Sequence, residues 1–226
     1  FRRYHMVRLT FALLYAFHEN FCLPLSHDEV VYGKKSLWDK MPGNVWEKCA
    51  NLRLLLGYMF AEPGKKMLFM GGEFGQRNEW DNNVQLSWEL LEQPEHRALA
   101  FFVRDLNALY QREPALYTLD FDWRGFQWID FRDADSSVIS FLRLSPQADD
   151  TLFFVFNFTP VVRRRYRLGV PFPGYWREIV NSDASCYGGS DVGLGGGVEA
   201  DPIGTHGQGY SVELTLPPLG FLVLKR

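Results

Sequence analysis

The spacing of apolar residues divides the chain into two parts that meet near residue 114. In the first part, apolar residues recur at three- and four-residue intervals, which predicts helices over residues 6–17, 44–60 and 94–110. Between them, short apolar runs predict strands over residues 21–26 and 66–70, the second buried on both faces. Helix, strand, helix, strand, helix is the order of βα units around a parallel sheet, so this part is expected to be α/β.

The helix expected over residues 44–60 has signals at both ends. Asn44 and Glu47 have the spacing of a capping box, in which each side chain bonds the backbone N–H of the other residue. Pro63 and Gly64 end the helix. Its apolar side chains are expected on one face, formed by Val45, Cys49, Leu52, Leu56 and Met59.

After Pro114 the apolar period changes to two, which predicts half-buried strands. The segments with this pattern are residues 126–132, 138–144, 152–158, 165–170, 175–180, 210–216 and 219–224. About seven short strands separated by turn residues predict an antiparallel β-sandwich. The glycine-rich segment 193–198 lacks the spacing of a phosphate loop and lies among strands, so a flexible loop is expected there.

The expected fold class is therefore α/β plus all-β, with residues 1–113 in the α/β part and residues 114–226 in the all-β part. Parallel strands need hydrogen-bonded neighbours, and two strands cannot close a barrel. We therefore expect residues 1–113 to be the end of an α/β domain that begins upstream of Phe1, which means that the chain is truncated at its start.

Charge and cysteine content narrow the classes of function. The chain has 24 Lys and Arg against 27 Asp and Glu, and its basic residues are scattered, which argues against nucleic acid as a partner. No apolar run approaches the ~20 residues of a membrane span, so no membrane partner is expected. Three cysteines without paired spacing argue against a disulfide framework and fit the reducing cytoplasm. The five histidines lack metal-ligand spacing, so no metal or cofactor is expected.

Chemically active side chains follow both predicted strands of the α/β part. His27, Asp28 and Glu29 follow the first strand, and catalytic groups in α/β sheets and barrels gather at this carboxyl end. Adjacent residues leaving a strand point to opposite faces, so only one of the two acids should face a site. The alternative interpretation is that His27 and Asp28 only cap the loop and bond backbone groups.

The second strand ends in a similar way. Two glycines and Glu73 follow Met70, and paired glycines let the backbone approach a neighbour closely. Trp80 lies further along this loop, where an exposed indole could stack on the C–H face of a sugar ring. A buried structural role for Trp80 is the alternative.

These residues lie in segments that resemble a known family. Residues 19–36, with the sequence ENFCLPLSHDEVVYGKKS, are similar to bacterial glycogen branching enzymes of the α-amylase superfamily. The resemblance extends to PGKKMLFMGGEF over residues 63–74, to REIVNSD over residues 177–183, and to essentially the whole chain. It implies the last third of an enzyme with a (β/α)8 TIM barrel, holding the seventh and eighth βα units, followed by an all-β C-terminal domain.

The resemblance also implies a reaction. The family cleaves α-1,4-glucosidic bonds and forms α-1,6 branches with retention, which requires a nucleophilic carboxylate and an acid/base about 5–5.5 Å apart. In the family both precede the segment matched here, so this chain alone is expected to be inactive. The matching positions are Asp28, which stabilises the transition state, and His27, which binds the same sugar. Glu73, Trp80 and Lys34 match positions near the barrel mouth and are expected to bind substrate.

The expected partners are α-glucan chains, such as glycogen or amylose, and the remainder of the barrel upstream. Two alternatives stay open. The aromatic content of 16% and the sandwich pattern also fit a module that only binds or scaffolds α-glucan. Within the same superfamily, a hydrolase of the debranching or α-amylase type is the other alternative, and analysis of the products would distinguish it.

Overall fold

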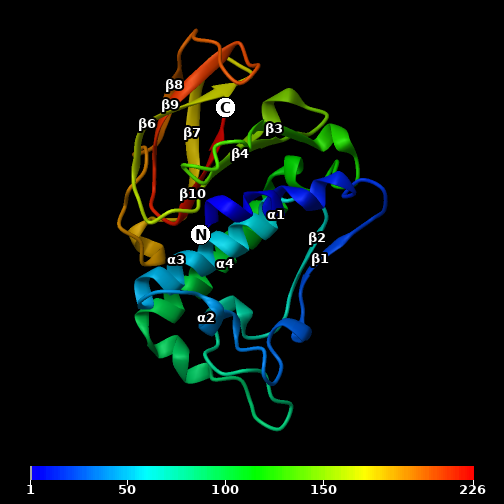
Figure 1. Ribbon diagram of the computed structural model, residues 1–226, viewed down its shortest axis with the longest axis vertical. Coiled ribbons are helices and arrows are strands. Elements are labelled where there is room, and N and C mark those ends of the chain that lie inside the picture. Colours follow the sequence, from blue (N-terminus) through cyan, green and yellow to red (C-terminus); the bar gives the residue numbers. More distant parts are fainter. Residues whose placement is uncertain (1) are drawn as a thin grey trace.

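Two parallel strands, four α-helices and an antiparallel β-sandwich form residues 2–226, which the computed structural model describes (Figure 1). The helices are α1 (Met6–Thr10), α2 (Leu37–Lys40), α3 (Val45–Ala61) and α4 (Pro94–Arg112). The strands are β1 (Cys22–Leu25), β2 (Lys65–Leu68), β3 (Phe126–Asp130), β4 (Val138–Arg143), β5 (Leu152–Asn157), β6 (Arg163–Val170), β7 (Gly174–Asn181), β8 (Gly197–Ala200), β9 (Tyr210–Leu216) and β10 (Gly220–Lys225). A membrane-spanning helix is not found among these residues.

β1 and β2 pair in parallel, which confirms the predicted βα order. The main-chain N–H of Phe69 extends the ladder by donating to the oxygen of Leu25 (2.9 Å). The expectation that the second strand is buried on both faces is wrong, because Met67 is 44% exposed. Among the described residues, helices cover one face of the pair, where Leu23, Leu25 and Leu68 contact the core that α3 and α4 share.

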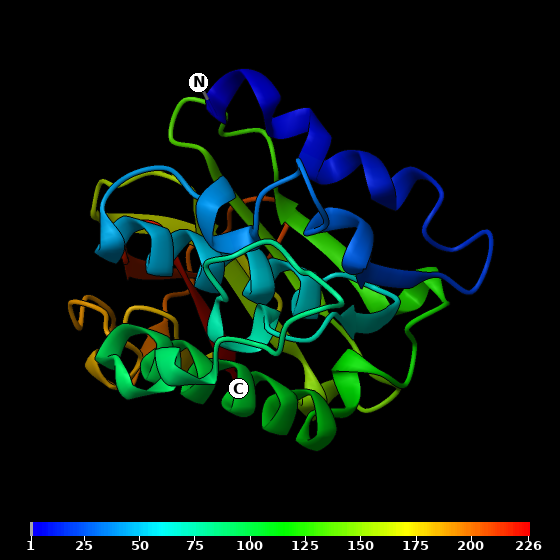
Figure 2. The same ribbon diagram turned by 90° about the horizontal axis from the view of Figure 1, so that it is seen from below.

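α3 is surrounded by protein along most of its length (Figure 2). Its predicted capping box is confirmed: the N–H of Glu47 donates to Asn44 Oδ1 (3.0 Å) and the N–H of Asn44 to Glu47 Oε2 (2.8 Å). Of the side chains expected on one apolar face, Val45 is exposed, and burial extends around the helix because α4, β5 and β10 all contact it. α3 and β10 approach each other closely at Gly57, where a Cβ atom would lie 2.0 Å from the Phe221 ring.

The all-β part is the predicted antiparallel sandwich. One sheet has the order β3-β4-β5-β10-β7-β8, and the other consists of β6 and β9. The core between the sheets includes Val155, Leu168, Trp176 and Leu214. The opposite face of the large sheet joins the core of α3 and α4 through a row of rings: Phe141, Phe154, Phe156 and Phe221. Much of the high aromatic content therefore packs the structure together.

Two segments differ from the pattern expected of them. The helix predicted over residues 6–17 is α-helical only in α1 and continues as the 3₁₀ helix η2 (Phe11–Leu14), which has no buried residue. Without burial of an apolar face, little tertiary packing stabilises a regular helix there. Instead of a free loop over 193–198, Gly197 begins β8, and the N–H of Leu194 donates to Glu178 Oε2 (2.8 Å). Gly196 and Gly197 have positive φ values and carry no side chain, so the sequence shows no period-two pattern at the start of this strand.

A buried ionic cluster joins the α/β part to the sandwich. Arg143 on β4 is completely buried and donates to Asp120 Oδ1 (2.9 Å) and to the main-chain oxygen of Ala61 at the end of α3 (2.7 Å). Asp120 also accepts from Lys65 Nζ on β2 (2.9 Å) and from Tyr110 Oη on α4 (3.0 Å). Burial raises the pKa of the Asp120 carboxyl, but Arg143 and Lys65 outweigh it and hold that pKa below its usual value.

Glu62, directly after α3, is buried near this cluster, and its Oε1 atom has no hydrogen-bond partner. Burial raises the pKa of this carboxyl from 4.5 to about 7, although Tyr58 and Arg143 act in the opposite direction. Between these two values the unfolded chain releases the proton while the folded chain keeps it. The contribution of Glu62 to folding stability therefore falls as the pH rises from 4.5 to about 7 and stays unfavourable above that.

Glu62→Gln is therefore expected to stabilise the full-length protein more at pH 8 than at pH 5, by about 2 kcal/mol. Denaturant unfolding at the two pH values measures the difference. Glu89→Gln, which changes an exposed carboxylate on the 3₁₀ helix η5 (Trp88–Glu92), is the matched control and should leave both midpoints unchanged. An equal effect of Glu62→Gln at both pH values would contradict the raised pKa.

Candidate active site

At the carboxyl end of β1 the chain turns into the 3₁₀ helix η3 (His27–Glu29), which exposes the two residues expected there. Ser26 fixes the turn, because its Oγ accepts the N–H of Asp28 (3.2 Å). The side chains of His27 and Asp28 are 54% and 69% exposed, and His27 Nε2 lies 3.5 Å from Asp28 Oδ1. Both groups thus face solvent at the end of a parallel strand, where α/β proteins carry their catalytic groups.

Glu29 turns to a different partner. Lys40 of α2 donates to the main-chain oxygen of Glu29 and lies 3.4 Å from its Oε2 atom. Asp28 and Glu29 therefore diverge, as expected of adjacent acids, and only Asp28 lies beside His27. This turn offers one carboxylate to a ligand and does not offer an acid/base pair.

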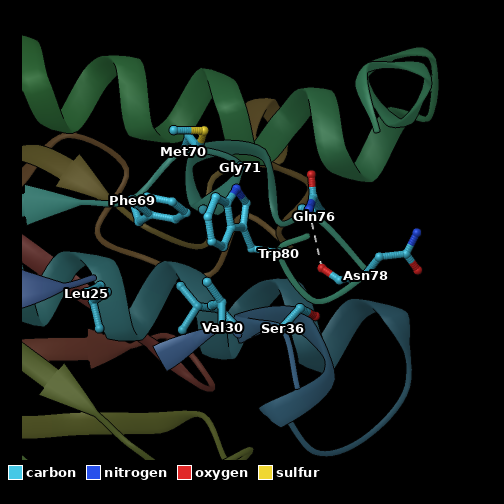
Figure 3. Close-up of a pocket in the computed structure, with 11 residues that line it drawn as sticks. Leu25, Val30, Ser36, Phe69, Met70, Gly71, Gln76, Asn78 and Trp80 are labelled. Carbon is cyan, nitrogen blue, oxygen red and sulfur yellow. Dashed lines mark hydrogen bonds between the residues drawn. The ribbon is translucent and has the colours of Figure 1, made fainter. Parts of the chain in front are cut away.

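Two aromatic rings from the segment after β2 lie close to His27. The ring centroids of Phe69 and Trp80 are 5.3 Å apart, and the His27 ring lies 5.9 Å from Phe69 and 6.3 Å from Trp80. Figure 3 shows the Phe69 and Trp80 rings side by side, with Val30 near the indole. The cavity that these residues line has a volume of 20 Å³, which is enough for about one water molecule. Because this cavity is too small for a sugar, a glucose ring can contact the half-buried Trp80 only on the solvent-exposed side of its indole.

Glu79, which has no distinctive sequence signal, joins the two loops at this end of the strands. Its Oε2 and Oε1 atoms accept the main-chain N–H groups of Gly33 (3.0 Å) and Lys35 (2.6 Å). Lys34 stands between these two residues on an exposed loop. The sequence places Glu79 beside Trp80, but nothing in it indicates that a residue more than forty positions away is its partner.

The loop that carries Trp80 is anchored on α4. Arg77 donates from Nε to His96 Nε2 (3.1 Å) and from Nη2 to Glu95 Oε1 (3.2 Å). Because Nε2 of His96 accepts, its proton is on Nδ1, which donates to the main-chain oxygen of Phe74 (2.8 Å). Burial lowers the pKa of His96, which favours this neutral form. These hydrogen bonds attach the start of the loop to the helix.

The structure separates Glu73 from the other predicted residues. Glu73 lies in the 3₁₀ helix η4 (Gly72–Phe74), and it lines a 410 Å³ cavity together with Lys66, Leu68 and residues of α3 and α4. That cavity is on the helix side of β2. His27, Asp28 and Trp80 are thus brought together, and Lys34 is linked to them through the backbone contacts of Glu79.

The sequence is similar along its whole length to curated branching enzymes. It is 58% identical to the 1,4-alpha-glucan branching enzyme GlgB of Aquifex aeolicus over 225 residues, which is 100% of this chain and 36% of that protein. The identity to GlgB of Aromatoleum aromaticum is 58% over 224 residues, 99% of this chain and 35% of that relative. The chain therefore spans about a third of the length of these relatives.

The all-β part has its own match. Residues 128–226 match the family described as alpha amylase, C-terminal all-beta domain. The crystal structure of the alpha-amylase from H. orenii shares the fold with a TM-score of 0.54 and 17% identity, covering 91% of this chain and 39% of that one. Over its full length, the chain is thus similar to the C-terminal region of 1,4-alpha-glucan branching enzymes, and residues 128–226 belong to the match with the C-terminal all-beta domain of alpha amylases.

Proposed function

We propose that this chain is the C-terminal part of a 1,4-α-glucan branching enzyme and that Asp28 is the carboxylate that stabilises its transition state. The observation that carries the proposal is the exposed pair of His27 and Asp28 at the carboxyl end of a parallel strand, beside the Trp80 ring. Barrels of parallel strands hold their active sites at this end. The 58% identity to GlgB supports the same reaction.

The α/β part then completes a (β/α)8 barrel. β1 is followed by the short helix α2 and then by α3, and the parallel strand β2 is followed by α4, which is the order of two consecutive βα units. Within the described residues β1 and β2 pair only with each other, so the remainder of the barrel would supply their outer neighbours. We assign residues 1–113 to the barrel and residues 114–226 to the all-β domain, and the cytoplasm stays the predicted location.

The chemistry assigned to Asp28 follows from charge and position. Retaining glycosyl transfer passes through an oxocarbenium-like state in which the sugar ring becomes positively charged and distorted. A carboxylate that bonds the ring hydroxyls and strengthens these bonds in the distorted state lowers the barrier, whereas uniform binding would not. His27, 3.5 Å away, can donate to the same sugar. The nucleophile and the acid/base belong to the part of the barrel upstream of this chain.

The remaining residues would bind the glucan chain. Trp80 offers an apolar ring to the C–H face of a glucose unit, and Lys34 on the adjoining loop offers a donor to its hydroxyls. The role of Glu73 rests on the family resemblance alone, because its carboxylate lines the cavity on the helix side of β2.

Incubation of the full-length protein with amylose tests the proposed function. We expect α-1,6 linkages to appear in the proton NMR spectrum while the number of reducing ends stays constant. A rise in reducing ends without new α-1,6 linkages would identify a hydrolase instead. If neither changes while amylose still binds, the chain belongs to a glucan-binding protein and the proposal fails.

Trp80→Ala in the full-length protein is expected to raise KM for amylose about tenfold, the effect of losing roughly 1.4 kcal/mol of stacking, with a smaller change in kcat. Steady-state kinetics against amylose of defined length measure the two constants. The control is Trp123→Ala, because Trp123 is 72% exposed on the 3₁₀ helix η7 (Trp123–Gly125) of the all-β part. An unchanged KM for Trp80→Ala would remove Trp80 from the binding site.

A further inference from the structure

We propose that Glu79 is a positioning residue that holds the loop carrying Lys34 in a fixed place relative to Trp80. Its consequence for catalysis rests on the proposed function, but its effect on the loop does not. The carboxylate accepts two main-chain N–H groups, from Gly33 (3.0 Å) and from Lys35 (2.6 Å), which lie on either side of Lys34. One side chain thus fixes the backbone on both sides of a residue expected to bind substrate.

Two more hydrogen bonds connect the same pair of segments. The N–H of Trp80 donates to the oxygen of Val30 (2.8 Å), directly after the turn that exposes His27 and Asp28. Ser36 Oγ donates to the main-chain oxygen of Arg77 (2.8 Å), at the other end of the loop. Glu79 lies between these contacts along its own segment, so residues 30–36 are joined to residues 77–80 at their two ends and in the middle.

The loop adopts a backbone conformation that needs this support. Gly33 and Lys35 have φ values of 81° and 67°, in the left-handed region. Glycine occupies that region freely, but a lysine does so at a cost, and such conformations persist only where the surroundings determine them. Hydrogen bonds from N–H groups to a carboxylate are stronger than those to a neutral acceptor. Glu79 supplies two of them, one of which is made by the N–H of the strained Lys35 itself.

Glu79 acts through its neighbours. Its two oxygens are occupied by the N–H groups of Gly33 and Lys35, while the adjoining Trp80 ring packs beside His27. Loss of the carboxylate should therefore release Lys34 and loosen the loop without removing any group that meets the sugar. The glutamine variant is the sharpest change, because an amide has the same size but its nitrogen cannot accept a hydrogen bond.

Hydrogen exchange of the full-length protein tests the effect on the loop. Glu79→Gln is expected to accelerate amide exchange in the peptide covering residues 31–36 about tenfold, since one charge-assisted bond is lost and the other weakened. Glu89→Gln, a matched change of an exposed carboxylate further along the same segment, should leave that peptide unchanged. Equal protection in Glu79→Gln and the unaltered protein would overturn the inference.

Kinetics of the same variants test the consequence for catalysis. If Glu79 acts through Lys34, then Lys34→Ala should lower kcat/KM for branching about tenfold in the unaltered protein, and much less in the Glu79→Gln background. A merely structural role would lower the amount of folded enzyme and leave the two effects multiplicative, which contradicts the inference. An unaltered protein without branching activity would refute the proposed function, while the exchange measurement would still decide the role of Glu79 in the loop.

Discussion

Asp28→Asn in the full-length protein is expected to lower kcat for branching by about 10³-fold, the scale seen when one group that stabilises transition-state charge is removed. The amide has nearly the size of the carboxylate but no negative charge to offset the charge that develops on the sugar ring. Because the Asp28 side chain is 69% exposed, the change should not affect folding. The rate of formation of α-1,6 linkages, together with the thermal unfolding midpoint, separates the two effects.

The neighbouring acid provides a matched control. Glu29 turns to Lys40 rather than to His27, so Glu29→Gln should lower branching less than tenfold. Near-normal turnover by Asp28→Asn would reject the assigned role. Equal losses in both variants would indicate damage to the turn itself and would also contradict a specific role for Asp28.

Arg143→Met is expected to destabilise the full-length protein by about 3–5 kcal/mol, because it leaves a buried carboxylate without its main partner. The guanidinium bonds Asp120 (2.9 Å) and also the main-chain oxygens of Ala61 (2.7 Å) and Leu116 (3.3 Å). Methionine fills much of the volume but satisfies none of these acceptors. Unfolding in denaturant, followed by tryptophan fluorescence, measures the loss.

A nearby surface pair is the control for this prediction. Asp122, which is half-buried, forms an ion pair with the exposed Arg124 at the protein surface, and such pairs contribute little, so Asp122→Asn should leave the unfolding midpoint unchanged. Replacing Asp120 and Arg143 together by Leu and Met should cost less than Arg143→Met alone, since the Asp120 carboxylate is then no longer buried without its main partner. A double variant that is less stable than the single variant would contradict this explanation.

The same ionic cluster predicts that the folding stability of the protein falls in acid. The pKa of Asp120 is held below its usual value in the folded protein, so its contribution to stability is present above the unfolded-state pKa and is lost as the pH falls through the folded-state value. Asp120→Asn should therefore show a flatter decline of stability in acid than the unaltered protein.

Local sequence signals predicted much of the fold. The Asn44–Glu47 capping box and the period-two strands depend on residues close together in the chain, and both predictions are confirmed. The parallel pairing of the two short strands is also confirmed, because the βα order leaves few alternatives. The exposure of His27 and Asp28 likewise agrees with their expected place at a strand end.

The features that the sequence did not predict depend on contacts between residues that are far apart in the chain. Arg143 and Asp120 are 23 positions apart, and Glu79 is 44 positions from Lys35, so no local pattern indicates either contact. Burial around α3 was missed for the same reason, because its extra neighbours come from the sandwich. Glu73 shows the remaining difficulty: a strand-end position does not determine which side of the strand its carboxylate faces.

The row of phenylalanine rings on the large sheet bears on any attempt to graft the all-β part onto another protein. A cut after residue 113 follows the change in sequence pattern, but it would strip α3 and α4 from Phe141, Phe154, Phe156 and Phe221 and expose these rings to water. A unit that is to be transferred must therefore include α3 and α4, or its exposed rings must be replaced by polar residues. The boundary that matters for such a graft is the packed interface between these rings and the two helices, which does not correspond to a single position in the sequence.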